Sequence, residues 1–457
     1  MMNISFFKYT VLSLCIGIVI TAQAAVSPEE AATLGAKLTP IGAERAGNAA
    51  GTIPEWTGGL PVNAGKVDAR GFLEDPYAKD TPLFVITAAN LEQYKGQLSE
   101  GQVAMFKRYP DTFKMPIYPS RRSAALPNNI YAKIKNSALK TTAVDGGYGV
   151  DNFSQSRYYA FPIPKSGLEV QWNHVTRYRG GNIERVITQA TPQVNGAFTP
   201  IRFDETVAGP QDLSDLPAGK GDNIVSYFKQ KVTAPSRLAG NVLLVYETLD
   251  QIKEPRSAWV YNAGQRRVRR APQVDYDGPG TAADGLRTTD NFDMFSGAPD
   301  RYDWKLVGKR EMYIPYNSYK LDSPSLKYKD IIQPGHINQD LTRYELHRVW
   351  EVVATVKPEA RHIYAKRTLY FDEDTWQIAL VDHYDGRGQL WRVAEGHMQQ
   401  YYHAQAAAYT LEVIYDLNAG RYLALGMKNE ERYSFKFDVP LRFSDFTPAA
   451  LRNAGVR

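Results

Sequence analysis

Histidines and carboxylates near the C-terminal end are the side chains best suited to catalysis or metal binding. They are His383, His397 and His403, together with Asp382, Asp385 and Glu395. An imidazole beside a carboxylate can bind zinc or transfer a proton. However, no short-range ligand spacing links these residues, and half-polar strands carry such residues without any chemistry. Two interpretations stay open: a hydrolase of envelope lipid or glycan that uses Asp382, His383 or Glu395, and a set of ordinary strand residues.

Common catalytic motifs are absent from the sequence. It has no G-x-S-x-G and no H-E-x-x-H, and GKG at 219–221 lacks the upstream glycine and the following Ser or Thr of a phosphate-binding loop. DYDG at 275–278 begins like a calcium loop, but Leu286 stands where the twelfth ligand, a glutamate, belongs. We therefore predict a protein that is not an enzyme and has no cofactor and no metal site.

The densest charge in the chain is the run RRVRR at 266–270. In a strand, Arg267 and Arg269 point to one face, where they could contact a phosphate headgroup or an acidic partner. The alternative is a solvated edge paired with nearby acidic residues such as Asp275. The whole chain has 54 Lys and Arg and 49 Asp and Glu, which are otherwise scattered and leave a net charge of +5, so we predict no nucleic-acid partner.

Aromatic residues make up 12% of the chain and are typical of pleated, half-buried surfaces. Trp and Tyr also suit an apolar cavity, because their rings contact a hydrophobic molecule while the N–H or O–H forms a hydrogen bond. Eight strand residues are candidates for lining such a cavity: Trp259, Tyr261, Trp304, Tyr313, Trp350, Tyr364, Trp391 and Met398. For each of them the alternative is ordinary core packing.

The elements that position these residues change in type along the chain. Residues 25–150 predict short helices and irregular segments, with capping boxes at Ser27/Glu30 and Ser99/Gln102 and a helix after Pro127. From about residue 155 the sequence predicts strands, at 185–192, 241–250, 257–272, 303–316, 343–358, 362–385 and 388–403. Because tight turns separate long consecutive strands, we expect an antiparallel meander over 151–457.

Neither face of these strands is wholly polar. In 346–356, for example, Trp350, Val352 and Ala354 share one face while Val349 and Val353 lie on the other. A solvated sheet face is normally polar, so we expect much of the sheet to be covered on both sides. Two arrangements fit this pattern: a sandwich or a sheet under helices, and a strongly curved sheet whose concave face receives a ligand.

The N-terminus predicts export. Residues 1–24 combine Lys8, the apolar run VLSLCIGIVI at 11–20 and the small-x-small pattern AQA at 22–24, as in a cleavable signal peptide. The only cysteine, Cys15, lies within it, and no later apolar run is long enough for a transmembrane helix. We therefore expect a periplasmic protein without disulfides. The proline- and glycine-rich stretch at 38–61 predicts an irregular strap, anchored by Trp56.

Three long motifs resemble a known bacterial family. ERAGNAAGTIPEWTGG, DTFKMPIYPSRRSAALP (111–127) and FPIPKSGLEVQWNHVTRYRG (161–180) look like signatures of the domain-of-unknown-function family 1329, whose members are often labelled outer-membrane lipoprotein-sorting-like. The match extends over essentially the whole mature chain. WVYNAGQRRVRRAP, DGLRTTDNFDMFSG and LYFDEDTWQIALVDHYDGRG are more loosely similar to the wider LolA/LolB-like group.

The resemblance implies a mainly β (α+β) fold, with a long curved antiparallel sheet forming a half-barrel that helices and irregular N-terminal segments cover. It also implies a periplasmic carrier or chaperone for a lipid-like or other hydrophobic molecule. The partners it implies are an RND-type inner-membrane exporter and an outer-membrane-associated protein. Because the N-terminal region exceeds what a small carrier needs, a lid, a docking surface and plain packing stay open for it. A non-carrying accessory subunit of the exporter is the alternative function.

Overall fold

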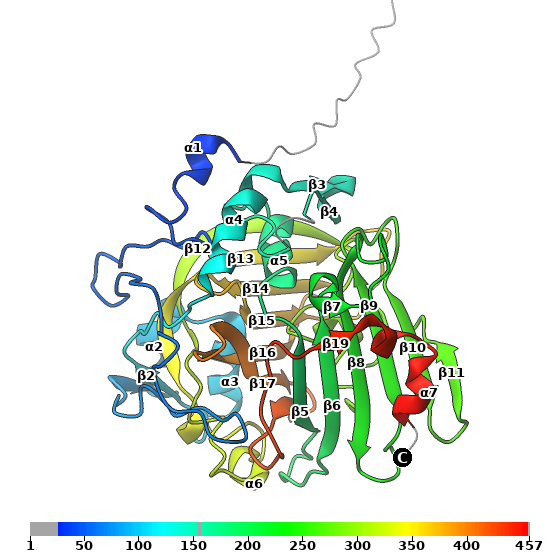
Figure 1. Cartoon of the computed structure of the whole chain (residues 1–457). Helices are drawn as coiled ribbons and strands as arrows, with labels where there is room; N and C mark the ends of the chain where they lie inside the picture. The colour runs from blue at the N-terminus through cyan, green and yellow to red at the C-terminus, as the bar shows by residue number, and fades with distance from the viewer. Residues whose placement is uncertain (1–25, 154–156, 456–457) are drawn as a thin grey trace, which may run out of the picture.

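A computed structural model of the chain describes residues 26–153 and 157–455 (Figure 1). The predicted signal peptide at 1–24 lies outside these residues. The main feature is one 15-stranded sheet with the order β1-β2-β13-β14-β15-β16-β17-β18-β5-β6-β8-β9-β10-β11, in which β12 also pairs with β13. No helix among the described residues is both long enough and apolar enough to cross a membrane.

The strands and helices have the following bounds. The first strands are β1 (Phe84–Ile86), β2 (Met115–Tyr118), β3 (Thr142–Val144), β4 (Gly149–Asp151), β5 (Ile183–Ala190), β6 (Ile201–Ala208), β7 (Leu213–Ser214), β8 (Ile224–Ala234), β9 (Val242–Thr248), β10 (Ser257–Asn262) and β11 (Arg267–Arg270). The later strands are β12 (Tyr302–Pro315), β13 (Tyr344–Val356), β14 (Lys366–Asp372), β15 (Ile378–Tyr384), β16 (Leu390–Tyr401), β17 (Ala406–Asp416), β18 (Arg421–Met427) and β19 (Leu441–Arg442). The helices are α1 (Pro28–Ala31), α2 (Leu91–Tyr94), α3 (Glu100–Arg108), α4 (Asn128–Lys140), α5 (Gly167–Val175), α6 (Tyr328–Ile331) and α7 (Ala450–Gly455).

Apart from β1 and β2, the sheet consists of two antiparallel meanders joined edge to edge. The first meander is formed by β5, β6, β8, β9, β10 and β11, and the second by β12 to β18. The last strand of the second meander, β18, pairs with the first strand of the first, so that Leu425 lies opposite Gln189. In Figure 1 the strands β13 to β16 run across the view while β5 to β11 run up and down it, because the sheet curves between the two meanders. The predicted fold class, a mainly β protein with a long curved antiparallel sheet, is confirmed.

Local sequence signals account for several helix boundaries. Ser27 and Glu30 form the expected capping box of α1, and Ser99 and Gln102 form that of α3. The predicted helix after Pro127 is α4. The N-terminal region also contributes β1 and β2 to the main sheet, where β2 pairs in parallel with β13. The domain boundary near residue 150 stays a prediction.

The two faces of the sheet have different covers. The inner face, which carries Val352 and Leu369, packs against α4, α5 and the segment 289–297. The outer face, which carries Val393 and Leu411, packs against α2, α3 and the segment 319–341. On the first meander the outer face is covered by the short helix η6 (Phe443–Phe446) and by α7. The expectation that both faces are covered is therefore confirmed.

The strap, residues 38–61, is fastened to the inner side by buried polar groups. Arg122 donates hydrogen bonds to the carbonyl oxygens of Glu44 (2.7 Å) and Arg45 (3.0 Å). The Nε1–H of Trp56 donates to the carbonyl of Ala124 (2.9 Å), and the Trp56 side chain is buried beside Tyr131. These bonds add to the turn hydrogen bonds within the strap, such as that from the Asn48 N–H to the Ile53 carbonyl (3.0 Å).

Candidate functional site

A cavity lies on the inner face of the first meander, between the sheet and the segment 289–297. We call it the inner cavity. About 120 Å³ of it is open to the centres of water molecules, and with its open mouth it comprises about 880 Å³ of empty space. Its lining is Arg177, Arg179, Ile183, Arg185, Val207, Val225, Ser226, Phe228, Glu247, Phe292, Asp293, Ser296, Ala407, Ala408, Tyr409 and Phe435. Apolar walls with a few polar groups are typical of sites for small molecules.

Asp293 fixes the segment that roofs the inner cavity. Its carboxylate accepts a hydrogen bond from Arg177 and another from Arg179, whose Nη2 lies 3.0 Å from Oδ2. Burial alone would raise the pKa of Asp293, but the two guanidinium groups outweigh it and hold that pKa well below its usual range. Both arginines follow the C-terminal end of α5, so the helix positions the roof through this ion cluster.

Two further ion pairs lie on the sheet wall of the cavity. Arg185 Nε donates to Glu205 (2.6 Å), whose other oxygen accepts a hydrogen bond from Gln230 Nε2 (2.6 Å). Arg256 is paired with Glu247, with 2.7 Å between Nη2 and Oε1. Because each guanidinium has a carboxylate beside it, these charges are compensated within the wall.

Glu412 lies behind the roof and forms no ion pair with any residue that the structure describes. Its carboxylate accepts a hydrogen bond from the backbone N–H of Met294 (2.9 Å). Burial raises the pKa of Glu412 to about 7, and the charge of Asp293 adds to that effect. The group therefore changes its charge near neutral pH.

A smaller cavity adjoins the inner cavity, and we call it the side cavity. It shares Phe228, Glu247, Phe292 and Ser296 with the inner cavity and has about 50 Å³ open to water centres. Its remaining lining comes from Gln230, Leu243, Val245, Arg256, Val274, Pro279, Gly280, Thr281, Arg287 and Thr289. The two cavities thus form one hollow along the inner face of β5 to β9.

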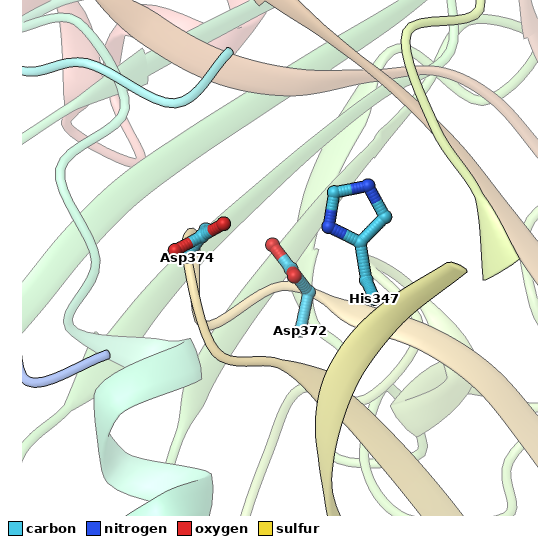
Figure 2. A group of neighbouring side chains, drawn as sticks. All are labelled: His347, Asp372 and Asp374. Carbon is cyan, nitrogen blue, oxygen red and sulfur yellow. The ribbon is translucent and has the colours of Figure 1, made fainter. Parts of the chain in front are cut away.

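A second group of titratable residues lies in the second meander (Figure 2). The ligand atoms of His347, Asp372 and Asp374 are all within 4.8 Å of one another, and the three side chains are buried. Asp374 accepts hydrogen bonds from Nε and Nη2 of Arg122 (2.8 and 2.7 Å), and His347 Nε2 lies 3.0 Å from Glu345. Since Arg122 also holds the strap, we interpret this group as a structural network rather than as a metal site.

The eight candidate lining residues lie elsewhere, and none of them lines the inner or the side cavity. Trp259 and Tyr261 pack on the outer face against α7 and η6, and Tyr313 packs on the outer face against Phe84 and Tyr94. Trp304, Trp350, Tyr364 and Met398 lie on or beside the inner side of the second meander, where Trp350 stacks on Trp376. Trp391 is half-buried and donates a hydrogen bond to Asp416 (3.0 Å).

The predicted hydrolase residues are not brought together. Asp382 points to the outer face and accepts a hydrogen bond from Ser99 at the start of α3 (3.0 Å). His383 points to the inner face, where its ring centroid lies 4.5 Å from that of Tyr364. Glu395 accepts a hydrogen bond from Tyr344 (3.1 Å) in the outer core. His397 lies 3.5 Å from Glu395, whereas His403 is exposed in a turn.

Sequence reasoning missed the residues that line the cavities. Arg177 and Arg179 lie in the motif VTRYRG, and Arg287, Phe292 and Asp293 lie in DGLRTTDNFDMFSG. The first motif resembles a signature of family 1329 and the second is loosely similar to the LolA/LolB-like group, but the resemblance assigns no site to either. The signal in the sequence that could have indicated these residues is the presence of arginines in segments without the periodicity of a helix or a strand. Arg267 and Arg269 are exposed on the last strand of the sheet, and no ion pair involves them among the described residues.

The fold and the site define a class: a mainly β protein whose curved sheet encloses an apolar cavity with buried ion pairs. The chain matches the family model described as a protein of unknown function (DUF1329) over residues 85–452. The chain belongs to this family, and the predicted resemblance is confirmed.

Relatives and solved structures place the chain among similar proteins. It is 64% identical over 435 residues to the uncharacterized protein PA3922 of Pseudomonas aeruginosa, with 95% of each chain covered. A solved DUF1329 family protein from Desulfovibrio piger is similar at 14% identity and a TM-score of 0.43, covering 62% of this chain and 95% of that chain. The LolA superfamily protein NE2245 from Nitrosomonas europaea is similar at 10% identity and a TM-score of 0.36, covering 62% and 98%.

Proposed function

We propose that the protein is a periplasmic carrier or chaperone that binds a lipid-like or other hydrophobic molecule in the inner cavity. The observation that supports this function is the cavity itself. Phe228, Phe292 and Phe435 line it, and the residues that close it come from irregular segments at 177–179 and 292–296 rather than from packed helices. An alkyl chain in water gains roughly 25 cal/mol for each Å² of apolar surface that such a cavity removes from solvent.

The cellular setting is part of the same proposal. The signal-peptide pattern at 1–24 supports export to the periplasm, and the family resemblance supports an RND-type exporter and an outer-membrane-associated protein as partners. Release of the bound molecule then depends on a partner that moves the roofing segment. Crosslinking in whole cells followed by affinity purification tests this arrangement, and recovery without either partner contradicts it.

Binding in the cavity is tested with a neutral hydrophobic dye. We expect the mature protein to bind N-phenyl-1-naphthylamine and to release amphiphiles on organic extraction, detected by mass spectrometry. Ser226→Trp places an indole in the inner cavity and is expected to weaken dye binding by about tenfold or more, because the chain-binding volume is filled. Val194→Trp is the matched control, since Val194 is exposed away from the cavity.

The result that would overturn the carrier proposal is specific. Neither dye binding nor an extracted amphiphile would be found with the wild-type protein, or Ser226→Trp would bind the dye as well as Val194→Trp does. Normal folding of both variants is checked by circular dichroism and by thermal unfolding.

A non-carrying accessory subunit is the second candidate, and the packed inner face of the second meander supports it. There Trp376 and Phe371 are fully buried under α4, α5 and the strap, as in a structural scaffold. This candidate would be favoured by two results together: the wild-type protein does not bind the dye, and Ser226→Trp still forms the exporter complex normally. Loss of transport with an intact complex would favour the carrier.

A further inference from the structure

Arg287 differs from every other arginine that lines the two cavities. Among the five, Arg177 and Arg179 are paired with Asp293, Arg185 with Glu205 and Arg256 with Glu247. Arg287 lines the side cavity and is only 5% exposed. No carboxylate within ion-pair distance and no hydrogen-bond acceptor meets its guanidinium among the described residues, and its Nε is buried without a partner.

The surroundings of Arg287 leave room for its guanidinium. A Cβ added to Gly280 would lie 2.9 Å from Cζ of Arg287, so the glycine provides the space that the group occupies. Phe292 lies on the other side, with its ring centroid 5.5 Å from Cζ. A buried cation without a counter-ion is destabilising, and a folded protein retains one where a ligand supplies the missing charge.

The guanidinium of Arg287 lies next to Phe292, an apolar residue that lines both cavities. Phe292 lines both the side cavity and the inner cavity, and Phe228 does so too. A ligand atom beside Arg287 is therefore next to the entrance of the larger, mostly apolar space. The side cavity, with about 50 Å³ open to water centres, has room for a small polar group rather than for a chain.

We propose that Arg287 binds the oxyanion of an anionic amphiphile, a carboxylate or a phosphate, in the side cavity while its alkyl chain lies in the inner cavity. This inference rests on the proposed carrier function and adds to it the chemical class of the ligand. The planar fork of a guanidinium forms two parallel hydrogen bonds with either oxyanion. Arg185 and Arg256 each have their own carboxylate and Arg177 and Arg179 share Asp293, so the specificity for an anion is assigned to Arg287.

The test compares two ligands with the same chain and different heads. Decanoate and 1-decanol are titrated against the bound neutral dye in the wild-type protein and in Arg287→Gln, Arg287→Lys and Arg452→Gln. Arg452 is exposed on α7 and serves as the control. We expect the wild type to bind decanoate about 10- to 100-fold more tightly than decanol, because only the carboxylate can form a charge-assisted hydrogen bond with Arg287.

Arg287→Gln is expected to abolish that preference and leave the decanol affinity within about twofold of the wild type. Arg287→Lys is expected to retain part of the preference, because it keeps the charge but loses the fork. Without ligand, Arg287→Gln is expected to have an unchanged or higher Tm, since it removes a buried charge that has no ion pair among the described residues. This combination of weaker anion binding and undiminished stability separates ligand binding from a structural role.

Other outcomes decide between the two proposals. If decanol displaces the dye and Arg287→Gln binds decanoate as the wild type does, the assignment of Arg287 is wrong while the carrier function stands. If neither amphiphile displaces the dye, but inorganic phosphate raises the Tm of the wild type and not of Arg287→Gln, the site takes a free oxyanion and the carrier proposal is wrong. If no anion has any Arg287-dependent effect, the anion site is refuted.

Discussion

The inner face of this sheet is filled over the second meander and hollow over the first. On the filled half, Trp376 and Phe371 are buried under α4, α5 and the strap, and the small cavity beside Trp56 has only about 10 Å³ open to water centres. On the hollow half, irregular segments that include 177–179 and 279–297 cover the sheet and leave about 120 Å³ open to water centres. The same strand pairing thus supports a core in one half and a cavity in the other, depending on what covers it.

The difference lies in how each cover is attached. On the filled half the helices pack through apolar side chains such as Ile134 and Val170, which exclude water, while hydrogen bonds from Arg122 hold the strap. The roof of the hollow half has Met294 and Phe295 in the apolar core, but beside the cavity it is held by ions, with Asp293 between Arg177 and Arg179. Ion pairs fix a position without filling the space beside it, so a cover of this kind can span a cavity.

The largest expected effect comes from the filled half. Trp376→Ala removes a fully buried indole that donates a hydrogen bond to the carbonyl of Ile41 (2.8 Å). We expect a loss of about 3–5 kcal/mol in the free energy of unfolding, measured by urea denaturation. Dye binding in the hollow half is expected to stay within about twofold of the wild type.

The matched change in the hollow half is Phe228→Ala. Phe228 is half-buried, so we expect a smaller loss of about 1–3 kcal/mol together with clearly weaker dye binding. The contrast between the halves fails if Phe228→Ala leaves binding intact, or if folded Trp376→Ala no longer binds the dye.

The next effect concerns a buried carboxyl of the filled half. Burial raises the pKa of Asp382 to about 7. Because the folded state binds this proton more tightly, the stabilisation is complete only below the ordinary pKa of an aspartate and is lost as the pH rises through 7. Between pH 5 and pH 8 we expect the wild type to lose about 2–3 kcal/mol relative to Asp382→Asn.

Urea denaturation at several pH values measures this difference. Asp111→Asn, at an exposed position, is the control and is expected to follow the wild type at every pH. Parallel profiles for Asp382→Asn and the wild type would show that this carboxyl is not a source of pH dependence.

A smaller effect concerns the ligand affinity of the hollow half. Glu412 lies among Asp293, Arg185, Arg287 and the N–H of Met294, and its pKa of about 7 means that it gains charge near neutral pH. Its ionised form repels an anion and attracts Arg287. We therefore expect the affinity for decanoate to fall about 3- to 10-fold from pH 6 to pH 8.

Glu412→Gln is expected to remove this pH dependence, while decanol binding stays independent of pH in both proteins. Dye displacement at each pH provides the measurement. A pH-dependent decanoate affinity that persists in Glu412→Gln would assign the effect to another group.

The smallest effect is expected at the far edge of the hollow half. Arg267 and Arg269 are exposed on β11, and no ion pair of the described residues includes them. Replacing both with Gln is expected to change the free energy of unfolding by less than about 0.5 kcal/mol and to leave decanoate binding unchanged. A larger change in decanoate binding would indicate that the ligand site extends beyond the two cavities to β11.

Much of the fold was accessible from the sequence because the signals were local. The capping boxes of α1 and α3 and the helix α4 follow from residues close in the chain. The pairing of β18 with β5 was not accessible, since it joins segments more than two hundred residues apart. This pairing makes one sheet from two meanders.

The site was less accessible for a related reason. Tyr261 was expected in a cavity because it is aromatic and lies in a strand, but the periodicity of a strand does not say which face is hollow. The C-terminal helix α7 occupies the face to which Tyr261 points. Conversely, Arg177 and Asp293 meet only after folding, 116 positions apart in the chain.

The arginine-rich strand β11 also bears on how copies of the protein meet. It is the last strand in the order of the sheet, so one side of its backbone is free to pair with another chain. A second copy that approached edge to edge would bring two runs of exposed arginines into contact, and their repulsion opposes such pairing. The charges that contribute little to the fold of one molecule thus disfavour its growth into a continuous intermolecular sheet, and with it aggregation at high concentration.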